Sequence, residues 1–279
     1  MHMKKAAILY DFDKTLCTKD MQEYSLIPSL GYDDPREFWD EVTELSVRNR
    51  MDGISAYLYV LQNKFAQHGT PLKREMFTSL GREIVLYPGV TTWFKRINAY
   101  ARKAGFLLEH YIISSGMTEI IEGTEIAREF RKIYACRYFY EDDTAVWPAQ
   151  IVNYTTKTQY IFRINKQVLD ENDDAALNEY VDQKERPVPF SRMVYVADGI
   201  TDVPCMKIVR EYGGSSVAVY NPGSKKAEKT ARKLIDDGRA TYMAAADYSE
   251  NSDMEILMKK IIDRMKAESA LEDLEGAYR

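Results

Sequence analysis

The sequence has few cysteines, and they do not form a recognisable pattern. Cys17, Cys136 and Cys205 are odd in number, far apart in the chain and without the spacing of zinc ligands. Small secreted scaffolds use closely spaced, even-numbered cysteines, and structural zinc sites use short cysteine pairs. We therefore expect neither a disulfide framework nor a zinc site, and we interpret the thiols as those of a reduced, intracellular protein.

Long apolar runs and an excess of positive charge are also missing. No stretch approaches the about 18 apolar residues that a membrane-spanning helix needs, and the start, Met-His-Met-Lys-Lys, lacks the features of a signal peptide. A net charge of -5 disfavours nonspecific binding to nucleic acid or to anionic membranes. The sequence thus predicts a soluble cytoplasmic protein without nucleic-acid or membrane partners, and leaves its oligomeric state open.

A strand pattern followed by an all-helical stretch begins the chain. Residues 6–10 form a short apolar run typical of a buried strand. Helix signals then follow without a strand between 17 and 86. They predict helices over 34–48, over 54–65 and from 70 to about 81. An all-helical block after a first strand is best interpreted as an inserted cap domain of residues 17–86.

Strand and helix patterns alternate in the rest of the chain, which predicts a parallel sheet with helices on both faces. The predicted fold class is α/β, a Rossmann-like core of residues 1–16 and 87–279 that carries the small helical cap. We expect residues 170–187 to form a surface excursion and the charged tail from about 267 to fray. The predicted strands are 110–115, 193–198, 216–220 and 240–246, with a hairpin within 133–152, and the predicted helices are 90–105, 117–131, 156–170, 204–213, 224–237 and a last one from 252.

Two carboxylates stand at the end of the first strand. Asp11 and Asp13 are separated by one residue, so a strand would place them on the same side of the backbone. Carboxylates this close repel each other unless a cation lies between them or one remains protonated. The pair indicates a metal site, an acid/base pair or both, although a solvated turn after an edge strand would also give this pattern.

Three further polar clusters follow later strands, where ligands of parallel sheets bind. Each also has a simpler explanation, because a serine-glycine turn is often a helix cap, a lone lysine is usually solvated, and an aspartate before a proline caps a helix. Together they would provide oxygen ligands for a hard cation such as Mg²⁺ and positive groups for a phosphate. The clusters are the turn Ser114-Ser115-Gly116, the lysine Lys157 and the acidic loop with Asp198 and Asp202.

The order of these residues strongly resembles the haloacid dehalogenase superfamily and its phosphoserine-phosphatase-like branch. Its four motifs match Asp11-Phe-Asp-Lys-Thr, Ser114, Lys157 and Asp198-Gly-Ile-Thr-Asp202. The resemblance implies that Asp11 is the nucleophile and Asp13 the general acid/base. It implies phosphoryl binding by Lys157 and by the Ser114 turn with Ser115 and Gly116. It also implies a Mg²⁺ site made by Asp11, the Asp13 carbonyl and Asp198, with Asp202 in support.

The match has departures, and they leave the substrate unassigned. Ala197, Thr201 and Ser115 stand where this branch often has glycine, asparagine and glycine, and Lys166 is a second candidate for the motif lysine. The predicted function is a Mg²⁺-dependent phosphatase that hydrolyses a small phosphorylated metabolite through an aspartyl-phosphate. The alternatives are a phosphomutase or phosphotransferase and a non-catalytic metal-binding protein. In the cap, the candidate anion contacts are Arg36, Arg48 and Arg50.

Overall fold

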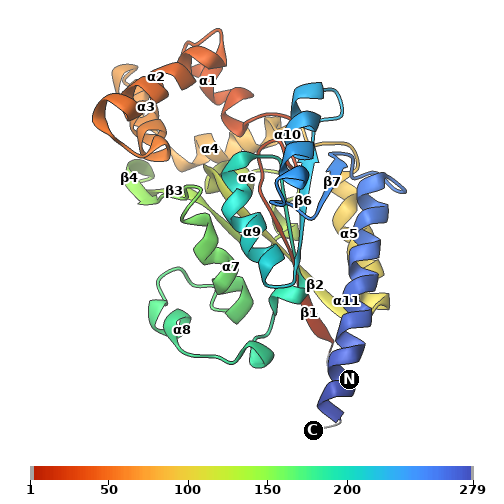
Figure 1. Ribbon diagram of the computed structural model, residues 1–279. Helices are drawn as coiled ribbons and strands as arrows, with labels where there is room; N and C mark the ends of the chain where they lie inside the picture. Colours follow the sequence, from red (N-terminus) through yellow and green to blue (C-terminus); the bar gives the residue numbers. More distant parts are fainter. Residues whose placement is uncertain (1–2, 278–279) are drawn as a thin grey trace.

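A computed structural model describes the backbone of residues 3–277 and the side chains of residues 3–275. Its centre is one sheet with the strand order β4-β3-β2-β1-β5-β6-β7, parallel except for the β3/β4 hairpin (Figure 1). The α/β fold class is confirmed. The strands are β1 (Lys4–Tyr10), β2 (Phe106–Met117), β3 (Lys132–Glu141), β4 (Thr144–Gln150), β5 (Met193–Ala197), β6 (Ser215–Tyr220) and β7 (Tyr242–Ala245).

The register of β1 brings three of the predicted polar clusters together. Tyr10, the last residue of β1, pairs with Ile112 of β2 on one side and with Val196 of β5 on the other. Two residues further along each strand, the chain reaches Ser114 and Asp198. The order of strands reverses at β1, which is where ligands bind to sheets of this kind.

Helices cover both faces of the sheet, as predicted. The helices α5 (Val90–Lys103) and α11 (Asp253–Ala277) pack together on one face. On the opposite face lie α7 (Lys157–Lys166) and α9 (Val203–Glu211), with α10 (Lys225–Asp236) beside β6 and β7 (Figure 1). Both layers bury the central strands, since all five residues of β5 are buried.

The helical insertion after β1 is also present, at the top of Figure 1. The predicted N-cap Asp34 accepts a hydrogen bond from the Arg36 amide at 2.9 Å, which starts the second helix. A bridge between Cys17 and Leu86 closes the base of the insertion, although its limits as a separate domain stay a prediction. Its elements are η1 (Met21–Glu23), α1 (Leu26–Ser29), α2 (Pro35–Asn49), α3 (Gly53–Gln67), α4 (Arg74–Leu80) and η2 (Gly81–Glu83).

The β3/β4 hairpin of the core packs against this insertion. The Ala145 amide donates to the Leu72 carbonyl at 2.8 Å, and the Tyr138 hydroxyl donates to the Leu58 carbonyl at 2.9 Å. The Gln62 amide group donates to the carbonyl of Val146 at 2.8 Å. The insertion is therefore held to the core by the hairpin as well as by its own two ends.

The predicted helix over 117–131 is wrong in extent. Strand β2 continues to Met117, and only a short helix, α6 (Thr118–Glu122), follows before the 3₁₀ turn η3 (Ala127–Glu129). At Gly123 the backbone of α4 comes so close that an added Cβ would lie 1.9 Å from the Thr78 carbonyl oxygen. This contact between distant segments has no signal in the local apolar pattern.

The ends of two other helices also differ from the prediction. Helix α7 ends at Lys166, because Gln167 adopts the left-handed conformation. The tail predicted to fray is helical to Ala277 as part of α11. The Lys4 ammonium group holds it by hydrogen bonds to Ser269 Oγ at 2.7 Å and to Asp273 Oδ1 at 2.6 Å.

The excursion over 170–187 is mostly exposed, as expected, and contains two short helices, α8 (Asp174–Asn178) and η4 (Gln183–Glu185). Two further 3₁₀ turns flank β5, namely η5 (Phe190–Arg192) before it and η6 (Ile200–Asp202) after it.

A buried histidine on β2 makes the stability of the fold depend on pH. His110 lies against Tyr10 and Phe94, with its ring nitrogens 3.1 Å from the Tyr10 hydroxyl and 2.9 Å from Asn98 Oδ1. Burial lowers the pKa of His110 from 6.5 to about 3. The unfolded chain therefore takes up a proton below about pH 6.5 that the native protein binds only near pH 3.

The free energy of unfolding should decrease as the pH is lowered through this range, because the unfolded chain binds the extra proton. The variant His110→Gln should lack this pH-dependent contribution. Between pH 8 and pH 5 we expect wild type to lose about 2 kcal/mol more unfolding free energy than the variant. The raised pKa values of the site carboxylates act in the opposite direction but are common to both proteins. Urea unfolding at a series of pH values measures the difference, and parallel curves for the two proteins would contradict it.

Candidate active site

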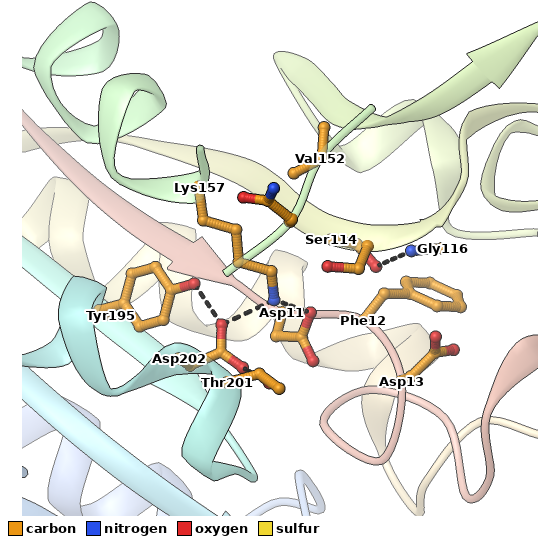
Figure 2. Close-up of polar contacts among 12 residues, drawn as sticks. Asp11, Phe12, Asp13, Ser114, Gly116, Val152, Lys157, Tyr195, Thr201 and Asp202 are labelled. Carbon is orange, nitrogen blue, oxygen red and sulfur yellow. Dashed lines mark hydrogen bonds and ion pairs between the residues drawn. The ribbon is translucent and has the colours of Figure 1, made fainter. Parts of the chain in front are cut away.

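A lysine and two aspartates meet at the carboxyl end of β1. Asp11 directly follows the strand, and its amide donates to the Val196 carbonyl of β5 at 2.9 Å. The ammonium group of Lys157, in the first turn of α7, lies 2.9 Å from Asp11 Oδ1 and 2.8 Å from Asp202 Oδ1 (Figure 2). All three side chains are buried. A positive charge is unfavourable at the first turn of a helix, because this end of the helix dipole is also positive. The two carboxylates offset this repulsion of Lys157.

Lys166, the second candidate for this role, lies elsewhere. Its ammonium group donates to the carbonyls of Leu177 and Glu179, both at 2.6 Å, on the surface excursion. The structure thus places Lys157 rather than Lys166 with the acidic residues.

Three carboxylates form a compact acidic cluster. Asp11, Asp198 and Asp202 each offer an oxygen atom, and these atoms lie within 4.8 Å of one another. Burial raises the pKa of Asp198 to about 8, helped by the charges of Asp11 and Asp202. Burial also raises the pKa of Asp11 to about 7, against the influence of Lys157. One buried ammonium therefore does not balance this cluster.

Asp13 lies beside the cluster, on the other side of Phe12 (Figure 2). The left-handed conformation of Lys14 turns the chain after it. Asp13 Oδ1 accepts a hydrogen bond from the Met21 amide at 2.8 Å. Burial, followed by the charges of Asp20 and Asp11, raises the pKa of Asp13 well above its usual value. These surroundings disfavour the charged form of the Asp13 carboxyl group.

Ser114, Ser115 and Gly116 lie inside β2, near its carboxyl end, and not in a turn after the strand as predicted. This segment provides a hydroxyl rather than an open cradle of amides. Ser114 Oγ accepts from the Gly116 amide at 3.0 Å, and the Met117 amide points at the sulfur of Met21. An added Cβ on Gly116 would lie 2.1 Å from Met21 Cε and 3.3 Å from Asp13 Oδ2, so glycine permits this close approach. With those two amides occupied, Ser114 keeps a hydroxyl proton to donate to an anion.

The acidic residues open onto a cavity of about 800 Å³ between the core and the helical insertion. The core contributes Asp11, Asp13, Ser115, Lys157 and Asp198 to its lining. None of the cap arginines considered as anion contacts lines it: Arg36 is exposed and pairs with Asp34, and Arg48 and Arg50 are exposed.

Tyr195 is a site residue that the sequence did not reveal. Its hydroxyl donates to Asp202 Oδ1 at 2.6 Å, the same oxygen that Lys157 contacts (Figure 2). The only signal for it was a residue with a polar tip in an otherwise aliphatic strand. The Tyr195 hydroxyl thus helps to fix the Asp202 carboxylate, and this carboxylate in turn positions Lys157.

We expect Tyr195→Phe to lower kcat roughly tenfold with little change in KM, because it loosens Asp202 without removing a group that contacts substrate. Tyr134→Phe is the matched control, since that hydroxyl on β3 donates to the Leu169 carbonyl instead. Steady-state kinetics measures both variants. Equal rates for Tyr195→Phe and wild type would show that the hydroxyl has no positioning role.

Comparison with known proteins agrees with this geometry. The family model of haloacid dehalogenase-like hydrolases matches residues 8–207. An uncharacterised protein of Borreliella burgdorferi is 28% identical over 294 residues, covering 91% of this chain and 96% of that protein. Within residues 3–277, no helix is long and apolar enough to cross a membrane.

Solved structures share the fold at low sequence identity. A hydrolase of the same family from Salmonella enterica serovar Typhi aligns with a TM-score of 0.58 at 13% identity, covering 92% of this chain and 71% of that one. A phosphoserine phosphatase in its apo form aligns with a TM-score of 0.55 at 15% identity, covering 92% and 98%. A probable phosphoserine phosphatase of Vibrio cholerae gives 0.58 at 14% identity, covering 95% and 67%. Together with the family match, the strand order and the position of the acidic residues, these findings show that the chain belongs to the haloacid dehalogenase-like hydrolase family.

Proposed function

We propose that this hydrolase is a Mg²⁺-dependent phosphatase that cleaves a small phosphate monoester through an aspartyl-phosphate on Asp11. The observation that carries the proposal is the meeting of Asp11 with Lys157, Asp198 and Asp202 at one end of the sheet. Asp13 and Ser114 stand beside them. A cytoplasmic location remains a prediction.

The donor set fits Mg²⁺. The cluster of Asp11, Asp198 and Asp202 offers only oxygen atoms, which hard divalent cations prefer. Burial, and after it the charges of neighbouring carboxylates, raise the pKa values of Asp11 and Asp198, and a bound cation would favour their charged forms. We assign the ion to Asp11, Asp198 and the carbonyl of Asp13, with Asp202 in support. When bound, Mg²⁺ would neutralise charge on the phosphate oxygens.

The chain's own residues provide the rest of the chemistry. An Asp11 carboxylate oxygen attacks phosphorus, and the bond from phosphorus to the alcohol oxygen breaks. Asp13 gives its proton to that oxygen, and then, as a base, takes a proton from the water that hydrolyses the aspartyl-phosphate. Lys157 and the Ser114 hydroxyl stabilise the phosphoryl oxygens throughout. A halide-displacing enzyme has no leaving oxygen to protonate, so Asp13 favours a phosphatase over a dehalogenase.

The test is release of inorganic phosphate from p-nitrophenyl phosphate by the purified protein. Turnover should require Mg²⁺, disappear with EDTA and return when Mg²⁺ is added in excess. Phosphate release without a sugar acceptor separates hydrolysis from the phosphomutase alternative. A protein that binds Mg²⁺ but turns over no phosphate ester would instead match the non-catalytic alternative and refute the proposal.

A further inference from the structure

The helical insertion provides one wall of the cavity, and the charged side chains on this wall are all negative. It contains two carboxylates, Asp20 and Asp52, and two aromatic rings, Trp39 and Tyr57. It contains no lysine or arginine. A leaving alcohol that carried a carboxylate or a second phosphate would therefore meet negative charge on this side.

The two carboxylates differ in how their charge is balanced. Asp20 forms an ion pair with Lys14. Asp52 has no ion-pair partner in the described part of the chain: its Oδ1 accepts from the amides of Ile54 and Ser55 at 3.0 Å, and its Oδ2 from Asn153 Nδ2 at 3.1 Å. Among the described residues, the neutral donors at the start of α3, which include the Ser55 hydroxyl at 3.4 Å, and one side-chain amide face this charge, and a bound cation would complement it.

On the same wall, the oxygen atom of a buried side-chain amide has no hydrogen-bond donor within residues 3–275. Gln22 is 3% exposed, lines the cavity and donates to the Tyr57 hydroxyl at 3.2 Å. Its amide oxygen has no hydrogen-bond partner among the described residues. An unpaired buried acceptor is costly, and an N–H group of a ligand would satisfy it. The half-buried Trp39 ring adds a face that attracts cations, and the buried Tyr57 ring packs against it with 5.7 Å between centroids.

This wall lies close to the phosphoryl site. Asn153, which contacts Asp52, accepts the Lys157 amide on its carbonyl at 2.9 Å. Asp52 therefore contacts the residue one helical turn before Lys157 in the chain, and both Asp52 and Lys157 line the same cavity. A short alcohol can bridge the two.

Resting on the proposed function, we infer that the substrate is the phosphate monoester of an amino alcohol without a carboxylate. Its phosphoryl group lies at Asp11 and Lys157, and its cationic nitrogen lies against Asp52 and the Trp39 ring. On the core side, Lys14 and Lys157 are already paired with aspartates, and Lys226 is exposed on α10.

The test compares kcat/KM for four esters with Mg²⁺: phosphoethanolamine, glycerol 3-phosphate, phosphoglycolate and p-nitrophenyl phosphate. We expect kcat/KM for phosphoethanolamine to exceed that for glycerol 3-phosphate by about tenfold and that for phosphoglycolate by about 100-fold. A single contact between charges, attractive or repulsive, changes binding by a few kcal/mol at most. Asp52→Asn keeps a good helix cap but should lower the ratio of phosphoethanolamine to glycerol 3-phosphate about tenfold. Trp39→Leu, which does not touch the cap of α3, should lower the same ratio.

Asp34→Asn is the matched control, because Asp34 caps α2 in the same insertion and does not line the cavity. It should leave every ratio unchanged. A preference for phosphoglycolate, or an unchanged ratio in both Asp52→Asn and Trp39→Leu, would overturn this inference while p-nitrophenyl phosphate turnover upheld the proposed function. No turnover of any ester would refute both.

Discussion

Asp11→Asn is expected to abolish turnover of every phosphate ester, with kcat at least about 1,000-fold below wild type. The substitution keeps the size of the side chain but replaces the attacking carboxylate by an amide that is a poor nucleophile. Lys157 retains its contact with Asp202 at 2.8 Å, so the site should stay assembled. Phosphate release and mass spectrometry of the acid-quenched protein, which detects a phosphoryl adduct on wild type alone, measure the effect.

The stability of Asp11→Asn separates chemistry from folding. Because burial raises the pKa of Asp11 to about 7, its native charge is costly in the absence of bound cation, and its loss should not lower the melting temperature. Wild-type rates from the folded variant would exclude Asp11 as the nucleophile.

Lys157→Met is expected to reduce both activity and stability. The variant leaves Asp11 and Asp202 buried without their shared cation, which is typically worth about 3 to 5 kcal/mol. We expect kcat/KM to fall at least about 100-fold, because the phosphoryl oxygens also lose a positive contact. The stability deficit should shrink as pH falls from 8 to 5, since an acid with a raised native pKa binds protons more readily in the folded state.

Lys166→Met is the control for this variant, since Lys166 contacts only backbone carbonyls of the surface excursion among the described residues. Its kcat/KM should stay within about twofold of wild type. Urea unfolding with and without Mg²⁺ tests the electrostatic origin of the deficit. A larger loss of activity in Lys166→Met than in Lys157→Met would reverse the assignment of the two lysines.

Local patterns predicted those parts of the fold that depend on nearby residues. The strand before Asp11, the capped helix after Asp34 and the alternation of strands and helices after residue 87 are all present. The helix over 117–131 failed because β2 extends and Gly123 packs against the α4 backbone. The tail after 267 is helical, and Lys4, from the other end of the chain, contacts it.

By itself, the sequence determined the α/β class, the helical insertion and the order of acidic residues and lysine along the chain, because strand and helix periodicity and motif spacing are local properties. Only the tertiary structure decided which lysine meets Asp11, that Tyr195 supports Asp202 and that the cap presents Asp52 rather than arginines to the cavity. These facts depend on strand register and on the packing of segments far apart in the chain, where a hydrogen bond of 2.6 Å between Tyr195 and Asp202 leaves no trace in residue spacing.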